Sequence, residues 1–397
     1  MPNIKVVVGA NFGDEGKGLM TDYFCHQSIK NKQSCIVVLS NGGAQRGHTV
    51  NLLDGTKHTF KHFGSGTLTG AHTYCVKEFI LNPMQFVVEL DELRKLGVTP
   101  VVYVDSRCRW STPFDMICNH IIEETREIHK HGSCGMGIWE TVNRWDLKQD
   151  ISIATFNRLP YQTKVEHLML LRDVWLRSRL KDYGVSAIPE KWLSIVNAPG
   201  LINHFIDDVA LFCSYVHFVS PLILQNYDTV VYENGQGLLL SEEMSFMYGN
   251  NTTPSNTGIY NAYNNISQTF DKNSNIEFCF VTRTYMTRHG AGKFVTECDK
   301  SYINKDMFDE NNLTNEFQDQ LRYGELDISQ LKKRIENNLR TAESSRIPYT
   351  TTVAVTHTNE YEFDYSELRN NIINNVYVSN SKTRDSVKLF DATLCGE

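Results

Sequence analysis

The segment IKVVVGANFGDEGKGLMTDYF, residues 4–24, sets the start of the fold. Ile4–Val8 is rich in β-branched residues and predicts a buried strand that stops at Gly9. Glycine-rich sequence follows, and a helix-like segment begins at Gly18. A strand, a glycine loop and a helix gather backbone N–H groups and a helix N-terminus at one place. Such a place attracts phosphate.

Neither common phosphate-loop motif fits this stretch. Walker A spacing fails because Gly18, not a hydroxyl residue, follows Lys17, and G-x-G-x-x-G is also absent. The loop instead places Asp14 and Glu15 ahead of Lys17. A carboxylate beside phosphate is repelled unless it holds Mg²⁺ or removes a proton from a substrate, and both roles stay open for Asp14. Glu15 is expected to cap the start of the helix.

A second glycine loop, NGGAQRGHTV at residues 41–50, follows the predicted strand Ile36–Leu39. It carries His48 at the end of a strand, where ligands bind in open α/β sheets. A histidine there could protonate or hydrogen-bond an oxygen that gains charge. A purely structural histidine is the alternative.

Composition excludes several classes of protein. The chain has 397 residues, 41% hydrophobic content and a net charge of -7, which gives no reason to expect a nucleic-acid or membrane partner. The first strand begins almost at once, so no signal peptide is expected. Ten cysteines without paired CxxC spacing suggest reduced thiols in a cytoplasmic protein.

Apolar runs alternate with helical periodicity along the chain. This pattern predicts an α/β fold, a large and mostly parallel central sheet flanked by helices, in one domain over residues 1–397. Helices are predicted at Met84–Leu96, Phe114–His129 and Lys164–Leu180. Further strands are predicted at Val101–Val104, Thr229–Tyr232, Ile276–Val281, Val353–Val355 and Val376–Val378.

The two loops together resemble the adenylosuccinate synthetase family, whose fold is related to that of P-loop proteins. Its members carry G-D-E-G-K-G after the first strand and G-G-x-N-A-G-H-T in the second loop. Further segments resemble family motifs in the same order: GSCGMGIWE (132–140), ENGQGLLL (233–240), TTPSNTG (252–258), TRTYMTRHGAGKFVTE (282–297), RYGELD (322–327) and VTHTNE (355–360).

The resemblance implies a C–N ligase that joins L-aspartate to C6 of a 6-oxopurine nucleotide. Asp14 would remove the N1 proton, and O6 would attack the γ-phosphate of a nucleoside triphosphate. His48 would stabilise the developing charge, and the aspartate amine would then displace phosphate. Mg²⁺ would bind Asp14 and the backbone carbonyl of Gly47. Gln236 would orient the purine.

The resemblance also assigns residues to each substrate. The triphosphate would contact Gly13, Glu15, Gly16, Lys17, Gly18, Gly47, Thr49, Asn359 and Ser379. The monophosphate would contact Gln45, Ser133, Cys134, Arg144, Gln236, Thr253 and His289. Aspartate would contact Gln318 and Arg322. The expected assembly is a homodimer in which Arg144 reaches into the partner subunit.

Departures from the family pattern fall on recognition positions. Asn359 replaces an Asp that reads guanine, and an amide suits adenine better, which favours ATP or dATP over GTP as donor. An arginine-rich segment is reduced to Arg322, which weakens the case for a ribonucleotide. Gln45 replaces Asn, and His289 replaces Val. These changes resemble the phage and archaeal branch, 2-aminoadenylosuccinate synthase, which uses dGMP and would place the protein in a bacteriophage host's cytoplasm.

Asp14 fits that branch less well, because several phage members have a small residue there. Ordinary adenylosuccinate synthesis from IMP, aspartate and GTP is therefore the alternative substrate prediction. A nucleotide sensor without ligase activity and a phosphotransferase are alternatives from other classes. The retained pair Asp14 and His48 disfavours a sensor, which needs no proton-transfer residues.

Overall fold

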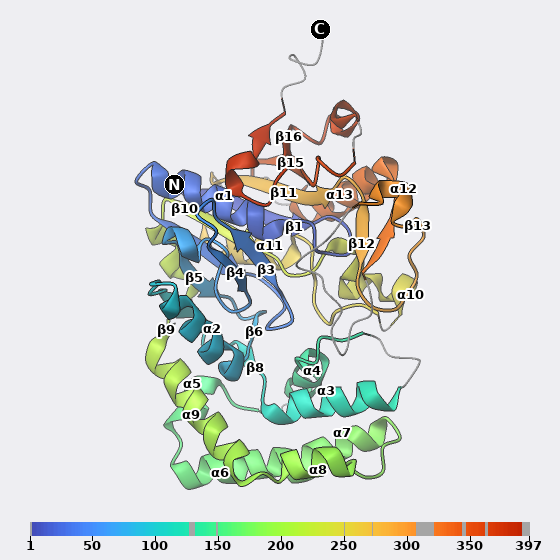
Figure 1. Ribbon diagram of the computed structural model, residues 1–397. Coiled ribbons are helices and arrows are strands. Elements are labelled where there is room, and N and C mark those ends of the chain that lie inside the picture. The colour runs from blue at the N-terminus through green and yellow to red at the C-terminus, as the bar shows by residue number, and fades with distance from the viewer. Residues whose placement is uncertain are drawn as a thin grey trace.

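A computed structural model gives the fold of the chain (Figure 1). It describes residues 2–126, 132–147, 150–249, 251–271, 273–306, 321–343, 347–361 and 364–390. All statements below refer to these ranges.

A ten-stranded sheet forms the centre of the described structure, in the order β17-β16-β15-β11-β1-β10-β2-β5-β7-β9. Neighbouring strands pair in parallel except β16 and β17, which are antiparallel. The α/β fold class predicted from the sequence is thereby confirmed. The strands are β1 Asn3–Gly9, β2 Cys35–Leu39, β5 His72–Cys75, β7 Val102–Val104, β9 His217–Phe218, β10 Thr229–Glu233, β11 Asn275–Arg283, β15 Tyr349–Thr356, β16 Asn375–Val378 and β17 Lys388–Leu389.

Both faces of the sheet are buried, because successive strand residues point to opposite sides. Ile4, Val6 and Val8 of β1 pack into one apolar cluster with α11 (Tyr260–Thr269) and α13 (Ile328–Glu343). Val7 points the other way, into a cluster with α1 (Lys17–Lys30) and α2 (Pro83–Lys95). This second cluster continues without a break into the helical layer, through residues such as Phe156 and Phe205.

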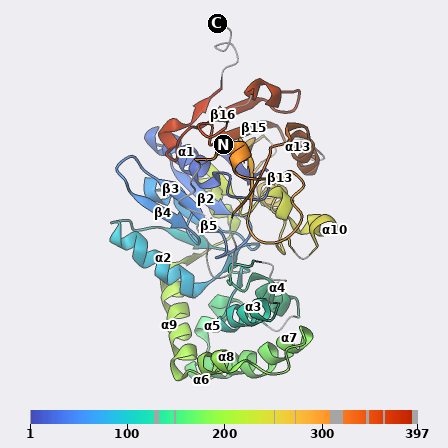
Figure 2. The ribbon, with the colours of Figure 1, turned by 45° about the vertical axis from the view of Figure 1, so that its right-hand side comes forward.

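The helical layer lies at the end of the molecule opposite β15 and β16 (Figures 1 and 2). Its helices are α3 Pro113–Thr125, α4 Ile138–Asp146, α5 Ile153–Arg158, α6 Tyr161–Leu170, α7 Arg177–Asp182, α8 Glu190–Val196 and α9 Pro199–Tyr215. The start of α3 is fixed by a capping box, in which Thr112 and Asp115 bond each other's backbone N–H. Proline at the first helical position adds to this start signal.

Three smaller sheets and two short helices complete the described part. The three-stranded sheet, at the right of Figure 1, holds the loop that carries His289. These elements are β3 His48–Asn51 with β4 Lys57–Phe60, β6 Ile80–Leu81 with β8 Arg109–Trp110, β12 Met286–Arg288, β13 Glu297–Cys298 and β14 Arg322–Gly324, and the helices α10 Ser245–Tyr248 and α12 Ser301–Asn304.

The structure corrects several element predictions. Strand β5 was missed because HTYC has no apolar run, although it is paired on both sides. The helix predicted at Phe114–His129 ends at Thr125 in the structure, and its last predicted residues lie outside the described ranges. The helix predicted at Lys164–Leu180 runs from α6 to α7 through a π-helical turn, Leu171–Leu176. None of the described helices combines the length and apolarity that crossing a bilayer requires.

Candidate active site

The carboxyl ends of the parallel strands bring the predicted loops to one edge of the sheet. The first glycine loop follows β1, the second follows β2, and the 234–237 loop follows β10, which lies between β1 and β2. On the other side of β1, the ends of β11, β15 and β16 carry the segments at Thr284, His357 and Ser379.

The first loop encloses a buried carboxylate and a buried ammonium. Lys17 Nζ lies 4.0 Å from Glu15 Oε2, and both side chains are almost completely buried. A Cβ at Gly9 would approach Glu15 Oε2 to 2.3 Å and Lys17 Nζ to 3.0 Å, so this position has no room for a side chain. Burial raises the pKa of Glu15 to about 7, and Lys17 opposes that shift.

Glu15 does not cap the helix as predicted. Its Oε1 accepts a hydrogen bond from the Asn11 backbone N–H at 2.5 Å, within the loop. The helix α1 begins after Gly16, which has a left-handed conformation and offers no side chain for capping. The N-terminus of α1 therefore keeps backbone donors available for an anion.

Asp14 lies at the accessible side of the same loop, with about a third of its side chain exposed. Its Oδ2 is 3.2 Å from His289 Nε2, and its backbone carbonyl accepts from Arg283 Nε at 2.5 Å. Burial alone would raise the pKa of Asp14. The hydrogen bond and charge of His289, with Lys17 and Arg283, lower it to about 2. Asp14 is therefore ionised at neutral pH.

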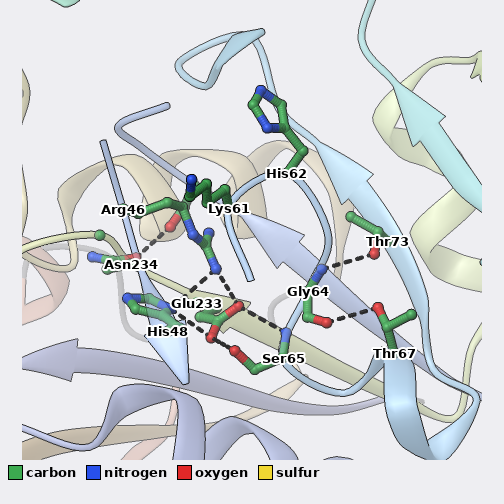
Figure 3. A network of polar contacts seen from close by, with 12 residues as sticks. Arg46, His48, Lys61, His62, Gly64, Ser65, Thr67, Thr73, Glu233 and Asn234 are labelled. Atoms are coloured by element: carbon green, nitrogen blue, oxygen red, sulfur yellow. Dashed lines mark hydrogen bonds and ion pairs between the residues drawn. The ribbon is translucent and has the colours of Figure 1, made fainter. Parts of the chain in front are cut away.

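His48 stands in a buried network with Glu233, the last residue of β10 (Figure 3). Its Nδ1 lies 2.7 Å from Glu233 Oε1, and Arg46 Nη2 lies 2.5 Å from Glu233 Oε2. The backbone N–H and hydroxyl of Ser65 also donate to this carboxylate. Burial lowers the pKa of His48 to about 4; the charge of Arg46 acts in the same direction, and Glu233 opposes both.

The two glycine loops meet directly. A Cβ at Gly18 would lie 3.1 Å from both His48 Cβ and the Thr49 carbonyl oxygen, so the first turn of α1 packs against the start of β3. Gly47 is exposed beside them, and the Thr49 hydroxyl pairs with that of Thr59 at 2.9 Å. The structure thus brings together Lys17, His48 and the backbone of Gly47.

The side-chain amides of Gln45 and Gln236 both lie against Gly42. A Cβ at Gly42 would lie 3.3 Å from Gln45 Nε2 and 3.3 Å from Gln236 Oε1. Within the described residues, Gln236 Oε1 and both polar side-chain atoms of Gln45 are buried without a hydrogen-bond partner. Buried polar atoms of this kind usually have partners, so a polar ligand is expected between these side chains.

The segment with Ser133 and Cys134 lies beside the second loop. Ile80 donates its backbone N–H to the Gly42 carbonyl at 2.7 Å and packs in one cluster with Met136 and Ile138. The Ser133 hydroxyl donates to Asn119 at 2.8 Å, and burial raises the pKa of Cys134.

Thr253 belongs to the same region. Trp139 Nε1 donates to the backbone carbonyl of the preceding residue, Thr252, at 3.4 Å. Its backbone N–H donates to Leu240 at 2.8 Å. Trp139 itself is 47% exposed, so it contributes a surface rather than core packing.

Asn359 and Ser379 lie at neighbouring strand ends on the far side of β1. Thr358 N–H donates to the Ser379 carbonyl at 3.1 Å, which ties the two loops together. Asn359 is exposed, whereas Ser379 is buried and its hydroxyl bonds Ser381 and Ser386.

Two further predicted residues, Arg144 and Arg322, have their guanidinium groups bonded within the chain, and a third lies outside the described residues. Arg144 is fully buried on α4, with both Nε and Nη2 2.9 Å from the Asp115 carboxylate, so its guanidinium group is paired within this chain. Arg322 is held by the Glu297 carboxylate and by the Gly290 and Gly292 carbonyls. Gln318 lies outside the described residues.

Sequence reasoning missed the residues that hold the loops. Arg334 of α13 donates to Ala10 and Asn11 at 3.2 and 2.5 Å, and the Thr356 hydroxyl donates to the Glu15 carbonyl at 2.9 Å. Glu233 carried a usable signal, because an acidic residue ending the apolar strand TVVYE needs a buried partner. Arg334 carried none, since it is an ordinary arginine in a polar helix.

The predicted Mg²⁺ donors are suited to that ion. Asp14 is ionised and partly exposed, and Gly47 is exposed at the start of β3, so both can offer oxygen atoms. Among the described residues, no group of three or more His, Cys, Asp or Glu side chains is arranged to hold a metal. One carboxylate with substrate phosphates and water is the usual environment for Mg²⁺.

Known proteins resemble this chain in sequence and in fold. The family model "Adenylosuccinate synthetase" matches residues 6–344. The chain belongs to the adenylosuccinate synthetase family. It is 27% identical over 300 residues to the adenylosuccinate synthetase of Mesoplasma florum and 28% identical over 298 residues to that of Lactobacillus helveticus. These matches cover 74% and 73% of this chain, and 65% and 64% of the relatives' own lengths.

Two solved structures share the fold of this family member. Fully ligated adenylosuccinate synthetase from Plasmodium falciparum gives a TM-score of 0.68 at 16% identity, covering 98% of this chain and all of that one. Succinoaminodeoxyadenylate synthetase of cyanophage S-2L, bound to dGMP and dATP, gives 0.60 at 12% identity, covering 98% of this chain and 95% of that one. At these identities the likeness concerns the fold alone.

Proposed function

We propose that this chain is a ligase that joins L-aspartate to C6 of a purine nucleoside monophosphate, with cleavage of a nucleoside triphosphate. The observation that carries the proposal is the meeting of the two glycine loops, which sets Gly18, in the first turn of α1, against His48. The charge of Lys17 is close enough to lower the pKa of His48. Asp14, ionised and partly exposed, belongs to the same loop as Lys17. A proton acceptor and a phosphate site at one sheet edge suit phosphoryl transfer to a purine oxygen.

In the proposed reaction, Asp14 takes the N1 proton of a 6-oxopurine, and O6 attacks the γ-phosphate. The bond between the β- and γ-phosphates breaks, and a 6-phosphoryl intermediate forms. The aspartate amine then attacks C6, the C–O bond breaks, and inorganic phosphate leaves. Lys17 and the start of α1 offset charge on the transferred group. Mg²⁺ bound to Asp14 and Gly47 would neutralise phosphate oxygens.

IMP and GTP are the substrates that the relatives best support, since those matched at 27–28% identity are named adenylosuccinate synthetases. The retained Asp14 agrees with this substrate pair. The family also supports a homodimer, which light scattering of the purified chain tests directly. A monomeric mass at micromolar concentration would contradict the homodimer.

A second candidate uses dGMP with ATP or dATP. It is favoured by Asn359, whose amide suits adenine, and by the buried oxygen atoms of Gln45 and Gln236, which lack a donor among the described residues. Guanine carries a 2-amino group, which hypoxanthine lacks, and this group would donate a hydrogen bond to one of these oxygens.

One experiment tests both candidates. The protein, Mg²⁺ and L-aspartate are incubated with IMP, GMP or dGMP, each crossed with ATP, dATP and GTP, and products are identified by mass. A succinyl adduct from IMP with GTP is the expected result, while adduct from dGMP with ATP or dATP would establish the second candidate. A phosphorylated nucleotide that accumulates without aspartate would indicate a phosphotransferase. The absence of product from every pair would overturn the ligase.

A further inference from the structure

Arg46 differs from the family pattern at a position next to His48. The second-loop motif G-G-x-N-A-G-H-T has alanine where this chain has Arg46 in GGAQRGHT. The residue as a whole is nevertheless only 2% exposed, because its side chain points into the protein beneath the loop. A buried arginine requires an explanation, since arginine is almost never fully buried unless it is paired.

The partner of Arg46 is Glu233, and the pair is completely enclosed. Arg46 Nη2 lies 2.5 Å from Glu233 Oε2, and both side chains have no exposed surface. Ser65 gives the same carboxylate two further donors, its backbone N–H at 3.2 Å and its hydroxyl. Figure 3 shows all these groups converging on Glu233. Charge-assisted bonds from three directions hold this carboxylate in one orientation.

The ring of His48 completes the network. Glu233 Oε1 lies 2.7 Å from Nδ1, and a carboxylate that is held ionised can only accept. Nδ1 must therefore carry the proton that lies between them. Nη2 of Arg46 lies 3.0 Å from the same nitrogen. Because Nδ1 already carries a proton and cannot accept another, Nη2 donates to the Glu233 carboxylate. No described residue is hydrogen-bonded to Nε2, which leaves that nitrogen for a substrate.

We propose that Arg46 and Ser65 are positioning residues, which hold the Glu233 carboxylate so that it fixes the tautomer and the direction of the His48 ring. The inference rests on the proposed function, where His48 meets the transferred phosphoryl group. Carboxylates orient catalytic and metal-binding histidines in this way in many enzymes. The distinctive feature of this chain is a buried arginine added behind the carboxylate.

Stability alone does not account for Arg46. Its Nε and Nη1 atoms are buried without a hydrogen-bond partner among the described residues. Unsatisfied buried donors are unfavourable, and buried ion pairs often contribute little to stability compared with apolar residues. Arg46→Ala leaves Glu233 buried without its cation and is expected to lose stability as well, so its folding is checked before its activity is compared.

The test compares Arg46→Ala, Arg46→Lys and Ser65→Ala with Arg179→Ala. Arg179 is a suitable control, because its Nε lies 2.5 Å from Glu140 in a mostly buried pair within the helical layer. Arg46→Ala should lower kcat about 10- to 100-fold, while KM for each substrate changes by less than about threefold. Arg46→Lys should recover part of kcat, Ser65→Ala should lose less, and Arg179→Ala should keep it.

A spectroscopic readout makes the test independent of activity. In protein labelled with ¹⁵N-histidine, the His48 signal is assigned by its absence in His48→Gln. The wild type should show the Nδ1–H tautomer at neutral pH, and Arg46→Ala a mixture. Folded Arg46→Ala with unchanged kcat and unchanged tautomer would overturn the inference.

The two proposals fail in different ways. If the wild type forms no adduct from any nucleotide, the proposed ligase fails, and the tautomer comparison still decides the role of Arg46. If Arg46→Ala does not fold, Arg46→Lys and Ser65→Ala carry the same test. In those variants an unaltered kcat and tautomer would count against the inference.

Discussion

Two buried arginine–carboxylate centres in this protein are built alike and serve different ends. Arg46 with Glu233 lies at the sheet edge where the two glycine loops meet, and Arg144 with Asp115 lies in the helical layer. Both guanidinium groups are enclosed, and each carboxylate is bonded by further protein donors. They differ in their third partner, because the first centre contacts a histidine with an open nitrogen.

The centre at Arg144 closes on itself instead. Arg144 Nη2 also donates to the Trp110 carbonyl at 2.7 Å, its Nη1 meets Asp150, and Asp115 belongs to the capping box of α3. These contacts join α4 to the start of α3, to β8 and to Asp150. The comparison teaches that burial of an ion pair does not by itself indicate its role. The role depends on whether a neighbouring polar atom, such as the ring nitrogen of His48, stays accessible to a ligand. We expect substitutions at the sheet edge to lower activity beyond any loss of stability, and those in the helical layer to lower stability alone.

The largest effect on activity is expected from Asp14→Asn. It should lower kcat by about 10²- to 10⁴-fold, because an amide cannot accept the N1 proton. The backbone of Asp14 has φ 58°, a left-handed conformation that asparagine tolerates well, so the fold should be kept. Adduct formation and thermal unfolding are measured together, with Asp91→Asn on exposed α2 surface as control. A near-normal rate would mean that another group removes the proton.

The largest effect on stability is expected from Arg144→Ala. Removing one partner leaves the Asp115 carboxylate buried and unpaired, which should lower the free energy of unfolding by about 3–5 kcal/mol. Denaturant titration measures this change. Arg109→Ala is the matched control, since Arg109 forms an exposed pair with Asp146 at 3.2 Å and should cost less than about 1 kcal/mol.

The opposite outcome at Arg144 would break the comparison. If Arg144→Ala keeps its stability and raises KM for the purine nucleotide at least about tenfold, Arg144 contacts substrate, as the family resemblance implied. The side chain would then have to leave Asp115 when the substrate binds.

A third pair, Asp22 of α1 with Arg384 near the C-terminus, tests how burial alone affects such a centre. Burial raises the pKa of Asp22 from its ordinary value of 3.8 to about 7, although Arg384 Nη1 lies 2.8 Å away. A raised pKa means that the folded state binds the proton more tightly. The stability contribution is full below about pH 4 and is lost as the pH rises through about 7.

In the wild type, the free energy of unfolding should therefore fall by about 2–4 kcal/mol between pH 4 and pH 8 because of Asp22, and Asp22→Asn should remove this fall. Denaturant titrations at several pH values give this slope for the wild type and the variant. Asp207→Asn, at an exposed position on α9, should leave the slope unchanged. Equal slopes for wild type and Asp22→Asn would show that Arg384 keeps Asp22 ionised.

The smallest effect is expected at the rim of the site. Asn359→Asp should lower the ratio of ATP to GTP turnover about tenfold, since a carboxylate accepts two hydrogen bonds from guanine and cannot donate to adenine. Because Asn359 is exposed, stability should stay the same. Competition between the two triphosphates measures the ratio. An unchanged ratio would remove Asn359 from base recognition.

Most of the central sheet was predictable, because buried parallel strands are continuous apolar runs. The run at Ile276–Val281 predicted the core of β11, whereas β5, with the sequence HTYC, left no such trace. Helix ends were less predictable. The end of α3 at Thr125 and the π-helical turn before α7 depend on packing rather than on local sequence.

By itself, the sequence determined the first strand, its glycine loop and helix, the position of His48 after β2, and the family. These features depend on neighbouring residues, whose spacing fixes backbone geometry. Only the tertiary structure decided which side chains meet. His48 finds Glu233 at a separation of 185 residues, and Arg144 turns inward to Asp115. Such contacts depend on strand order and helix packing, which place β10 between β1 and β2.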